Sequence, residues 1–485
     1  MVWRELNKTL KGLHNWKAAG VDGIPYEFLK TAWEDEERDD FNPEEPNSSL
    51  GKVLIKMVNL LLEFGIPADW NSCVAIPFHK KDDPKDMDNY RIIWLIRTVV
   101  KLATIIYKKR LDSELSRLNF LRKEQAGFRT MEEAVGQSAA LYEILRRRVI
   151  KGKKTYLAFI DFRKAYDTVP HEALLRKLHL LGVSGKAMIF TKSRYRHVQL
   201  LLRTESGYST RTIAVDLGTK QGCPESTTDF NIIINDILDC LDGIGVKVSG
   251  LRYKICGLLF ADDLVIISPT RAKLRRGLAA LDRWANLHEM EFGISKCAIM
   301  GIGQEAMDKV TSTNDSFTLG GRMIPVVTEY IYLGTLFTYD LDLDKMAGVR
   351  ADKGRKALHS IRPLLATKDI PLRLRVNIFK ATVIPVLSYG GELWGMNTCR
   401  CIKTQNILNE GLRVLLGVKR CSAIVSKDVL LEEFGIFSIH TITSAAKTRA
   451  LCKYSTVQTV IADLVNNHQY VQAKSVLGSQ EANVG

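Results

Sequence analysis

The chain has 485 residues, of which 46% are hydrophobic and 25% are charged, a balance that is typical of globular domains and excludes wholesale disorder and collagen-like repeats. No run of 18 apolar residues occurs, so we predict no membrane span, and the nine scattered cysteines without a C-x-x-C pair indicate reduced thiols rather than a disulfide framework. The formal net charge is +15, which suggests an anionic partner.

The positive charge is concentrated in two regions. Residues 345–453 hold 19 Lys and Arg against 7 Asp and Glu, and residues 101–154 hold 14 against 6. Residues 27–50 are acidic, with 2 basic and 9 acidic residues. Two basic regions suggest a nucleic acid, because contacts with phosphates release counterions, although solvated helical faces explain the same charges equally well.

The first 150 residues are predicted to be mainly helical. An acidic loop over 33–49 precedes a helix over Val53–Phe64, and a strand over Cys73–Phe78 follows. Two more helices are expected over Val99–Leu118 and Ala134–Val149. The apolar residues that recur at helical spacing in the first helix are Val53, Met57, Leu60, Leu61 and Phe64.

The middle of the chain combines strands and helices. A near-continuous apolar run predicts a buried strand over Tyr156–Phe162, and two apolar runs around a short acidic turn predict a hairpin over 255–268. The other expected elements are helices over His171–Leu181, Asp229–Leu241 and Leu274–Ala285, and a strand pair over Glu329–Phe337. Strand signals become rare beyond residue 345, so we expect an α+β region with antiparallel strands, followed by a helical region.

Three acidic residues lie where predicted strands end. Asp161 lies near the end of the first of these strands, and Asp262 and Asp263 occupy the turn of the hairpin. An Asp-Asp turn alone is ordinary turn chemistry. Three carboxylates brought together by a sheet, however, repel one another unless cations neutralise them. Carboxylate oxygens suit Mg²⁺, and two such ions would favour phosphoryl transfer.

A series of short blocks surrounds these acids. The blocks are Lys17–Pro25, Asn89–Arg91, Glu124–Arg129, Phe159–Asp167, Gln221–Pro224, Phe260–Asp263, Ile294–Cys297, Tyr332–Gly334 and Pro385–Gly390. In this order they resemble the reverse transcriptases of non-LTR (LINE-type) retrotransposons, over about residues 10–420.

The resemblance implies an α+β fold of the right-hand polymerase type, with fingers, an antiparallel-sheet palm and a helical thumb. The implied ranges are 1–150 for the fingers, which include the acidic loop 33–49, 151–340 for the palm and 341–465 for the basic thumb. We expect residues 466–485 to form a flexible tail.

The resemblance also implies roles at the catalytic centre. Asp161, Asp262 and Asp263 are implied to be catalytic and to bind two Mg²⁺ ions, or Mn²⁺ in their place. Lys296 is implied to protonate the leaving pyrophosphate, although a surface lysine explains this residue equally well.

Five further residues are implied to bind substrate. They are Tyr166 beneath the sugar, Arg91 and Lys81 at the triphosphate, and Gln221 and Gly222 at the template–dNTP pair. An ordinary buried aromatic is the alternative for Tyr166, and a solvated turn is the alternative for Lys81.

The implied activity is that of an RNA-directed DNA polymerase, a reverse transcriptase that transfers a nucleotide from a dNTP to a primer 3′-hydroxyl. The implied partners are an RNA template and a DNA primer or target DNA, with no membrane, in the nucleus and cytoplasm of the element's life cycle. The alternatives are a decayed or truncated remnant that only binds RNA, a group II intron maturase and an RNA-templated RNA polymerase, against which Tyr166 argues.

Several blocks depart from the family pattern. Glu225 and Asp229 replace leucines where a packed helix start is expected, and an unpaired charge buried there would be costly. These changes favour the remnant, whereas retention of all three acids favours an active enzyme. Asp167 is expected to cap the following helix.

Overall fold

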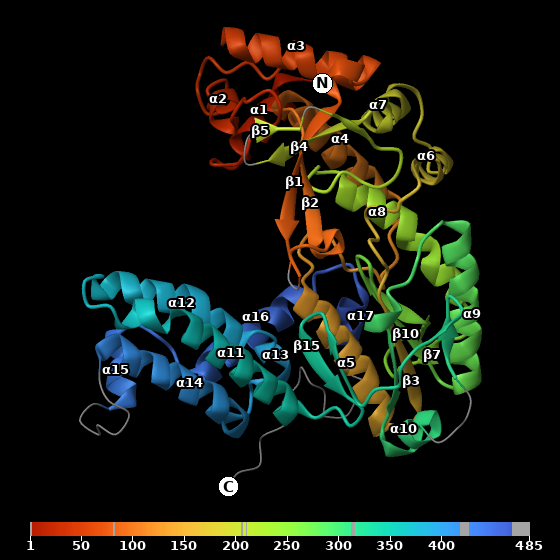
Figure 1. Ribbon diagram of the computed structural model, residues 1–485, viewed down its shortest axis with the longest axis vertical. Coiled ribbons are helices and arrows are strands. Elements are labelled where there is room, and N and C mark those ends of the chain that lie inside the picture. The colour runs from red at the N-terminus through yellow and green to blue at the C-terminus, as the bar shows by residue number, and fades with distance from the viewer. Residues whose placement is uncertain are drawn as a thin grey trace. The chain divides into compact units, whose positions relative to one another are not determined.

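The computed structural model describes residues 2–80, 83–204, 207–209, 211–311, 316–417 and 426–467 (Figure 1). The chain forms two compact units, each assembled from segments that are far apart in the sequence. Unit 1 comprises Met1–Arg122, Phe162–Ile237 and Arg283–Glu291, and unit 2 comprises Lys123–Asp161, Leu238–Asp282 and Phe292–Gly485. The units interleave along the chain, and the division into fingers, palm and thumb near residues 150 and 340 stays a prediction.

Unit 1 holds a five-stranded sheet. β1 (Ser72–His79) lies between β2 (Tyr90–Leu95), which is antiparallel to it, and β4 (Gln199–Thr204), which is parallel. The short strands β5 (Gly207–Tyr208) and β6 (Ile213–Ala214) both pair with β4. The strand predicted over Cys73–Phe78 is confirmed as β1. The sheet contains one parallel pair, β1 with β4, in addition to the expected antiparallel pairs.

The helices of unit 1 come from both of its longer segments. They are α1 (Trp3–Lys11), α2 (Tyr26–Lys30), α3 (Ser49–Phe64), α4 (Thr98–Arg117), α6 (His171–Leu180), α7 (Gly185–Tyr195) and α8 (Ser226–Ile234). The predicted helices at α3, α4 and α6 are confirmed. The single helix predicted over Asp229–Leu241 is wrong, because α8 ends at Ile234 and a 3₁₀ segment covers Asn235–Leu241.

The predicted apolar stripe of α3 is only partly buried. The buried apolar side chains are Leu54, Val58 and Leu61, whereas Val53, Leu60 and Phe64 are exposed, Phe64 by 70%. Apolar residues lie on two neighbouring stripes of this helix, and both have the spacing of an amphipathic helix. Packing against the rest of unit 1 therefore decides which stripe is covered.

A four-stranded antiparallel sheet lies in unit 2, in the order β11-β3-β10-β9. Its strands are β3 (Thr155–Ile160), β9 (Gly257–Phe260), β10 (Asp263–Ser268) and β11 (Ala298–Ile302). Every residue of β3 is buried, because the strand has a neighbour on each side and protein on both faces. The predicted buried strand and acidic hairpin are thus confirmed.

The remaining elements of unit 2 are mostly helical. The helices are α5 (Ala134–Ile150), α9 (Arg271–Leu287, whose last residues belong to unit 1), α10 (Gln304–Thr311), α11 (Leu343–Ala366), α12 (Leu372–Ser388), α13 (Gly391–Trp394), α14 (Thr398–Leu416), α15 (Lys427–Glu433), α16 (Ile439–Tyr454) and α17 (Val460–Asn466). Three short antiparallel pairs join β7 (Val246–Lys247) to β8 (Lys254–Ile255), β12 (Thr318–Leu319) to β13 (Arg322–Met323), and β14 (Glu329–Tyr332) to β15 (Thr335–Thr338).

The C-terminal third is helical, as predicted. Asn466 still belongs to α17, and residues 468–485 of the predicted tail lie outside the described residues. Among the helices that the structure describes, none combines the length and the hydropathy that a membrane crossing requires.

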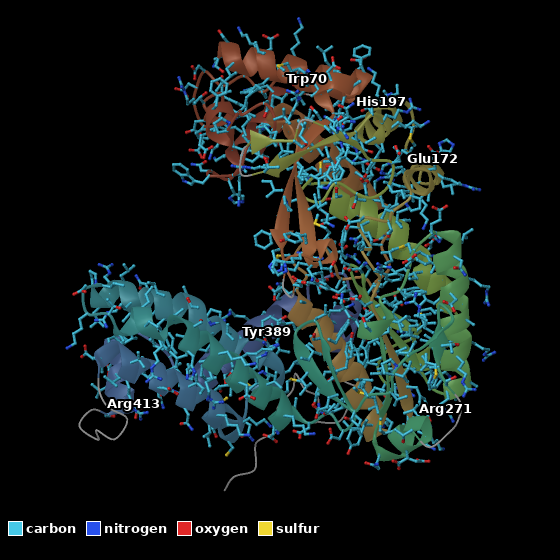
Figure 2. The ribbon with its side chains drawn as sticks, viewed as in Figure 1. Trp70, Glu172, His197, Arg271, Tyr389 and Arg413 are labelled. Atoms are coloured by element: carbon cyan, nitrogen blue, oxygen red, sulfur yellow. The ribbon has the colours of Figure 1, made fainter. Side chains whose placement is uncertain are left out.

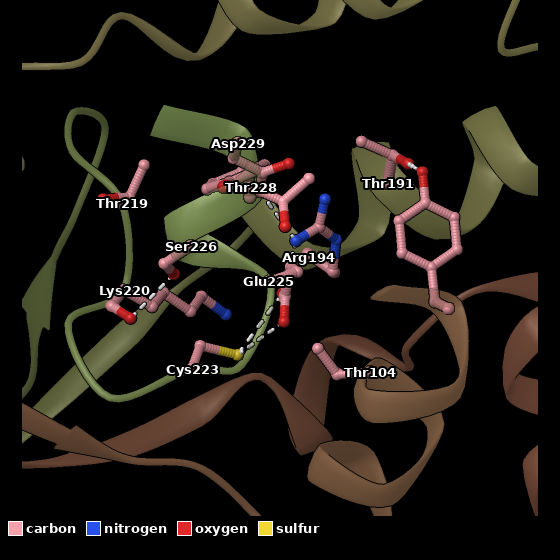
Figure 3. A network of polar contacts seen from close by, with 12 residues as sticks. Thr104, Thr191, Arg194, Thr219, Lys220, Cys223, Glu225, Ser226, Thr228 and Asp229 are labelled. Atoms are coloured by element: carbon pink, nitrogen blue, oxygen red, sulfur yellow. Dashed lines mark hydrogen bonds and ion pairs between the residues drawn. The ribbon is translucent and has the colours of Figure 1, made fainter. Parts of the chain in front are cut away.

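A buried ion network joins α7 to α8 in unit 1 (Figure 3). Arg194 forms ion pairs with Glu225 and with Asp229, the latter at 3.0 Å, and all three side chains are at most 2% exposed. The Tyr195 hydroxyl donates to Asp229 Oδ2 at 2.7 Å. The two acids that depart from the family pattern are therefore paired, and the cost expected for unpaired buried charges is largely offset.

Burial and pairing act in opposite directions on these groups. Burial raises the pKa of Asp229, and the charge of Arg194 opposes that shift. Burial alone would lower the pKa of Arg194, but the charges of Asp229 and Glu225 raise it. Arg194 and the two acids thus depend on one another in the interior, which makes the network sensitive to the loss of a single member.

We expect Arg194→Met to lower the free energy of unfolding of unit 1 by about 3–5 kcal/mol, because two carboxylates then lack their cation. The variant Arg194→Met/Glu225→Leu/Asp229→Leu should regain most of this loss, since apolar residues can replace a buried ion network. Urea titration monitored by amide exchange in α7 and α8 measures both effects. A triple variant as unstable as the single one would contradict the pairing.

Candidate active site

The register of β3 and β10 brings two of the predicted acids together in unit 2. The last pairs of the ladders are Leu264 with Ile160 and Asp263 with Phe260. One further step along the first ladder places Asp263 opposite Asp161. Side chains at opposite positions of an antiparallel pair point to the same face of the sheet, so the two carboxylates share one end of it.

The hairpin turn between β9 and β10 is held by its own neighbours. Ala261 adopts a left-handed φ of 58°. The buried side chain of Gln125 accepts hydrogen bonds from Ala261 N at 3.1 Å and from Gly127 N at 2.8 Å. A Cβ at Gly127 would lie 2.1 Å from Ala261 N. Gln125 and Gly127 thus fix the backbone from which Asp262 projects.

Asp161 is held by the segment that follows α9. Its carbonyl accepts a hydrogen bond from Gly293 N at 2.8 Å, and a Cβ at Gly293 would lie 2.4 Å from Asp161 Oδ2. The amide of Asp161 donates to Cys297 Sγ at 3.4 Å. The Lys296 ammonium forms an ion pair with Asp161 Oδ2 at 3.3 Å. A side chain at position 293 would therefore displace the Asp161 carboxylate from the place it occupies here.

The acids perturb one another. Partial burial, followed by the charges of Asp262 and Asp161, raises the pKa of Asp263 to about 6, and the charge of Lys296 opposes the shift. The Asp263 residue nevertheless has an exposed surface at the end of β10, so solvent screens part of this repulsion. Excess negative charge is concentrated at this end of the sheet.

The donor chemistry at this end of the sheet fits a divalent cation. Carboxylate oxygens are the ligands that Mg²⁺ prefers, and the raised pKa of Asp263 shows negative charge that a cation would offset. In the described part of the chain, however, no three His, Cys, Asp or Glu side chains converge in a way that could hold a metal ion. The set of ligands predicted from the sequence therefore stays a prediction.

The hairpin of β14 and β15 carries the predicted Tyr332–Gly334 block, also in unit 2. Its turn contains Leu333 and Gly334, both with positive φ. Tyr389, which follows α12 and is labelled in Figure 2, donates from its hydroxyl to Leu333 O at 2.8 Å. The Arg350 guanidinium lies 4.3 Å from the centre of the Tyr389 ring and donates to Gly334 O. Helical side chains thus fix the hairpin tip.

Unit 1 carries Tyr166, Gln221 and Gly222. The Tyr166 ring stacks on buried Phe230 of α8, with centroids 4.3 Å apart and an interplanar angle of 25°. Gly222 has a φ of 110°, and a Cβ there would lie 2.8 Å from Trp94 O. Among the described residues, this glycine allows a close approach to the backbone of β2.

The sequence suggested that Asp167 caps the following helix, but the structure shows that it does not. The N-cap of α6 is Pro170, and Asp167 Oδ1 instead accepts a hydrogen bond from the Gln221 amide at 2.9 Å. Burial raises the pKa of Asp167, while Gln221 and the charges of Lys164, Lys80 and Arg91 lower it. A turn after β3 cannot cap a helix that starts four residues later, and the carboxylate finds a donor in the neighbouring loop.

The predicted site residues are therefore divided between the units. Unit 2 carries Asp161, Asp262, Asp263 and Lys296, and unit 1 carries Arg91, Tyr166, Gln221 and Gly222. Arg91 lies on β2 opposite Phe78 and close enough to Asp167 to affect its pKa. Lys81 lies outside the described residues.

The sheet with its strand-end acid and acidic hairpin is the arrangement that the sequence resemblance implied. The chain belongs to the reverse transcriptase (RNA-dependent DNA polymerase) family, whose model matches residues 78–336, more than half of the chain. The predicted resemblance to non-LTR retrotransposon enzymes is also confirmed by individual relatives.

Two curated relatives illustrate this similarity. The Pol polyprotein of the type-1 retrotransposable element R2 from Popillia japonica is 24% identical over 338 residues, which cover 68% of this chain and 45% of the relative. The RNA-directed DNA polymerase from the mobile element jockey of Drosophila melanogaster is 23% identical over 363 residues, or 72% and 38% of the two chains. The chain thus spans less than half the length of these relatives.

A solved structure is a more distant likeness. The apo telomerase from Candida tropicalis, truncated from its C-terminal domain, has a TM-score of 0.39 and 11% sequence identity over 66% of this chain and 65% of that chain.

Four residues around the acids had no role in the sequence interpretation. Gln125 and Gly127 support the hairpin, and Gly293 and Cys297 support Asp161. Three of them lie in blocks that carry the family resemblance, but the resemblance assigned them no role. The sequence did not reveal which residues they contact, because each acts on a segment more than 100 residues away.

We expect Gly127→Ala to lower the midpoint of thermal unfolding, with a loss of about 1–3 kcal/mol typical of overpacking, because its Cβ would meet backbone. Gly348→Ala on α11 is the matched control, since no heavy atom lies within 4 Å of its Cβ position. That change should stabilise the helix by about 0.5–1 kcal/mol. Equal effects of the two substitutions would show that Gly127 does not contact the hairpin.

Proposed function

We propose that the chain is an RNA-directed DNA polymerase that adds nucleotides from dNTPs to a primer 3′-hydroxyl on an RNA template. The observation that carries the proposal is that Asp161, which directly follows β3, lies near Asp263 at the start of the neighbouring strand β10, within the range matched by the family model. Asp262 lies in the same turn. Acids at a strand end and in a hairpin turn suit a centre at which phosphates and cations meet.

The proposal includes a right-hand arrangement. The four-stranded sheet of unit 2 would serve as the palm, the sheet and helices of unit 1 as most of the fingers, and helices α11 to α16 as the thumb. The excess of 19 basic over 7 acidic residues in 345–453 supports contact of this helical region with the phosphates of a template–primer duplex. Such contacts read the backbone rather than the bases.

Asp161, Asp262 and Asp263 would hold two divalent cations, Mg²⁺ or Mn²⁺. When bound, such ions activate the primer hydroxyl and stabilise charge on the transferred phosphate and on the leaving pyrophosphate. The protein's own contribution is to hold two strands so that the carboxylates share one end of the sheet. Lys296 would donate a proton to the leaving pyrophosphate, and its ion pair with Asp161 Oδ2 at 3.3 Å supports this role.

The residues of unit 1 would bind the incoming nucleotide. Arg91 offers a planar guanidinium that matches phosphate oxygens, and Lys81 in the adjoining turn would add a point charge. Tyr166, supported from beneath by Phe230, would lie against the sugar, and Gln221 with Gly222 would contact the template–dNTP pair. The hydrogen bond from Gln221 to Asp167 links this loop to the turn that carries Tyr166.

A decayed remnant that only binds RNA is the second candidate. Its main support was the pair of acids at Glu225 and Asp229, and their ion pairs with Arg194 offset part of the folding penalty on which that argument depended. The retained acids and their intact supports favour the enzyme.

We expect Asp262→Ala to reduce dNTP incorporation on poly(rA)–oligo(dT) by about 100-fold or more, because loss of a metal ligand removes several kcal/mol of transition-state stabilisation. RNA binding should not be weakened, since the substitution removes a negative charge that would repel phosphates. Asp242→Ala, at an exposed position of the same unit, is the control and should retain activity. Wild-type protein that binds RNA and never extends a primer, with Mg²⁺ or Mn²⁺, would establish the remnant.

We expect Tyr166→Val to raise incorporation of rNTPs relative to dNTPs by about 10-fold or more, since filling or emptying a pocket changes discrimination by about 1–3 kcal/mol. Tyr208→Val, at a tyrosine of unit 1 that is 57% exposed, should leave the ratio unchanged. The measurement is the ratio of kcat/KM values for the two nucleotides. An unchanged ratio would identify Tyr166 as an ordinary packed aromatic.

A further inference from the structure

Tyr330 of β14 contacts the strand that ends in Asp161. Its ring stacks on Phe159 of β3, with centroids 4.1 Å apart and an interplanar angle of 13°. Phe159 precedes Asp161 by two residues, and Tyr332 of the same hairpin approaches the Phe159 ring only in a tilted geometry at 5.9 Å. The stack therefore places the Tyr330 side chain beside the acidic end of the sheet.

The Tyr330 hydroxyl makes a second contact, with the segment that carries Lys296. It donates a hydrogen bond to Lys296 O at 2.8 Å. Lys296 ends the 3₁₀ turn Ile294–Lys296, and its own amide donates to Gly293 O at 2.8 Å. One side chain thus connects β3 to this turn, and both elements carry groups of the proposed centre.

This contact matters because the Lys296 side chain is otherwise free to move. The side chain is 69% exposed, and its ion pair with Asp161 is 3.3 Å long. A lysine side chain loses much rotamer entropy when it is fixed in one geometry, and an exposed ion pair by itself stabilises such a geometry only weakly. A fixed backbone reduces the volume that the ammonium can sample around Asp161.

Burial, followed by the charges of Asp263 and Asp161, raises the pKa of the Tyr330 phenol. This shift agrees with the position of the side chain beside the acidic end of the sheet.

We propose that Tyr330 is a positioning residue of the polymerase centre, which holds the backbone of Lys296 so that its ammonium stays directed at Asp161 during nucleotide addition. The stack on Phe159 supplies a rigid base, and the hydroxyl supplies the link. This inference rests on the proposed function, and it assigns to Tyr330 a role that neither the sequence blocks nor the catalytic acids require.

Tyr330→Phe is the sharpest test, because it keeps the ring stack and removes only the hydroxyl. We expect kcat for single-nucleotide addition to fall about five-fold, the size expected for one hydrogen bond. KM for dNTP and the affinity for primer–template should each change by less than about two-fold. The thermal midpoint should change by no more than a few degrees. In the Lys296→Met background the same change should have no further effect, because the hydroxyl acts through Lys296.

Tyr332→Phe is the matched control. Within the part of the chain that the structure describes, the Tyr332 hydroxyl is buried without a hydrogen-bond partner, so its removal should leave kcat unchanged. An unchanged kcat in Tyr330→Phe, or an equal loss with and without Lys296, would overturn the positioning role.

Amide exchange separates this inference from the proposed function. Faster exchange over residues 293–297 in Tyr330→Phe than in Tyr332→Phe is expected whether or not primers are extended, and equal exchange would overturn the link between Tyr330 and the turn. Wild-type protein that never extends a primer would refute the polymerase and with it the catalytic purpose of that link. Active wild-type protein with an unaffected Tyr330→Phe variant would refute the inference alone.

Discussion

Carboxylates at one end of the unit 2 sheet repel one another, and the surrounding architecture has to hold them in place against that repulsion. The antiparallel register sets Asp263 opposite Asp161, and the resulting charge contributes to the raised pKa of Asp263, about 6. The acids themselves do not hold β3 and β10 together. Buried apolar ladders on β3 and β10 and the hydrogen bonds made by Gln125 and by the Gly293 amide hold them in place.

Two groups of acids, one in each unit, show how different surroundings give charges different roles. In unit 1, Glu225 and Asp229 are buried around Arg194, and the charges are compensated within the protein. In unit 2, Asp263 keeps an exposed surface, and the exposed Lys296, which pairs with Asp161, opposes the shift of the Asp263 pKa. A closed network contributes to folding, whereas an open and only partly compensated one is available to ligands. The geometry thus separates structural from proposed catalytic acids.

Particular residues show how far sequence reasoning extends. The strand and the hairpin that bear the acids were predictable, because their apolar runs have strand length, are rich in β-branched and aromatic residues and are bounded by turn residues. The buried stripe of α3 was only partly predictable, since two stripes with the same period compete and only packing chooses between them. The partner of Asp167 was missed because it lies on a loop more than 50 residues away, and Arg194 was missed because nothing in the local sequence marks it as the counterion of two acids.

The family, the order of the main elements and the identity of the acids follow from the linear order of residues, because they depend on local periodicity and on residue types at fixed spacing. The pairing of β3 with β10 and β11, the pairing of charges and the close approach at particular glycines became visible in the folded chain alone. Those properties arise from contacts between segments that are distant in the chain, as between Gln125 and Ala261 or between Tyr330 and Lys296. Local propensity contains no information about such contacts, since their energy appears only when both segments are folded.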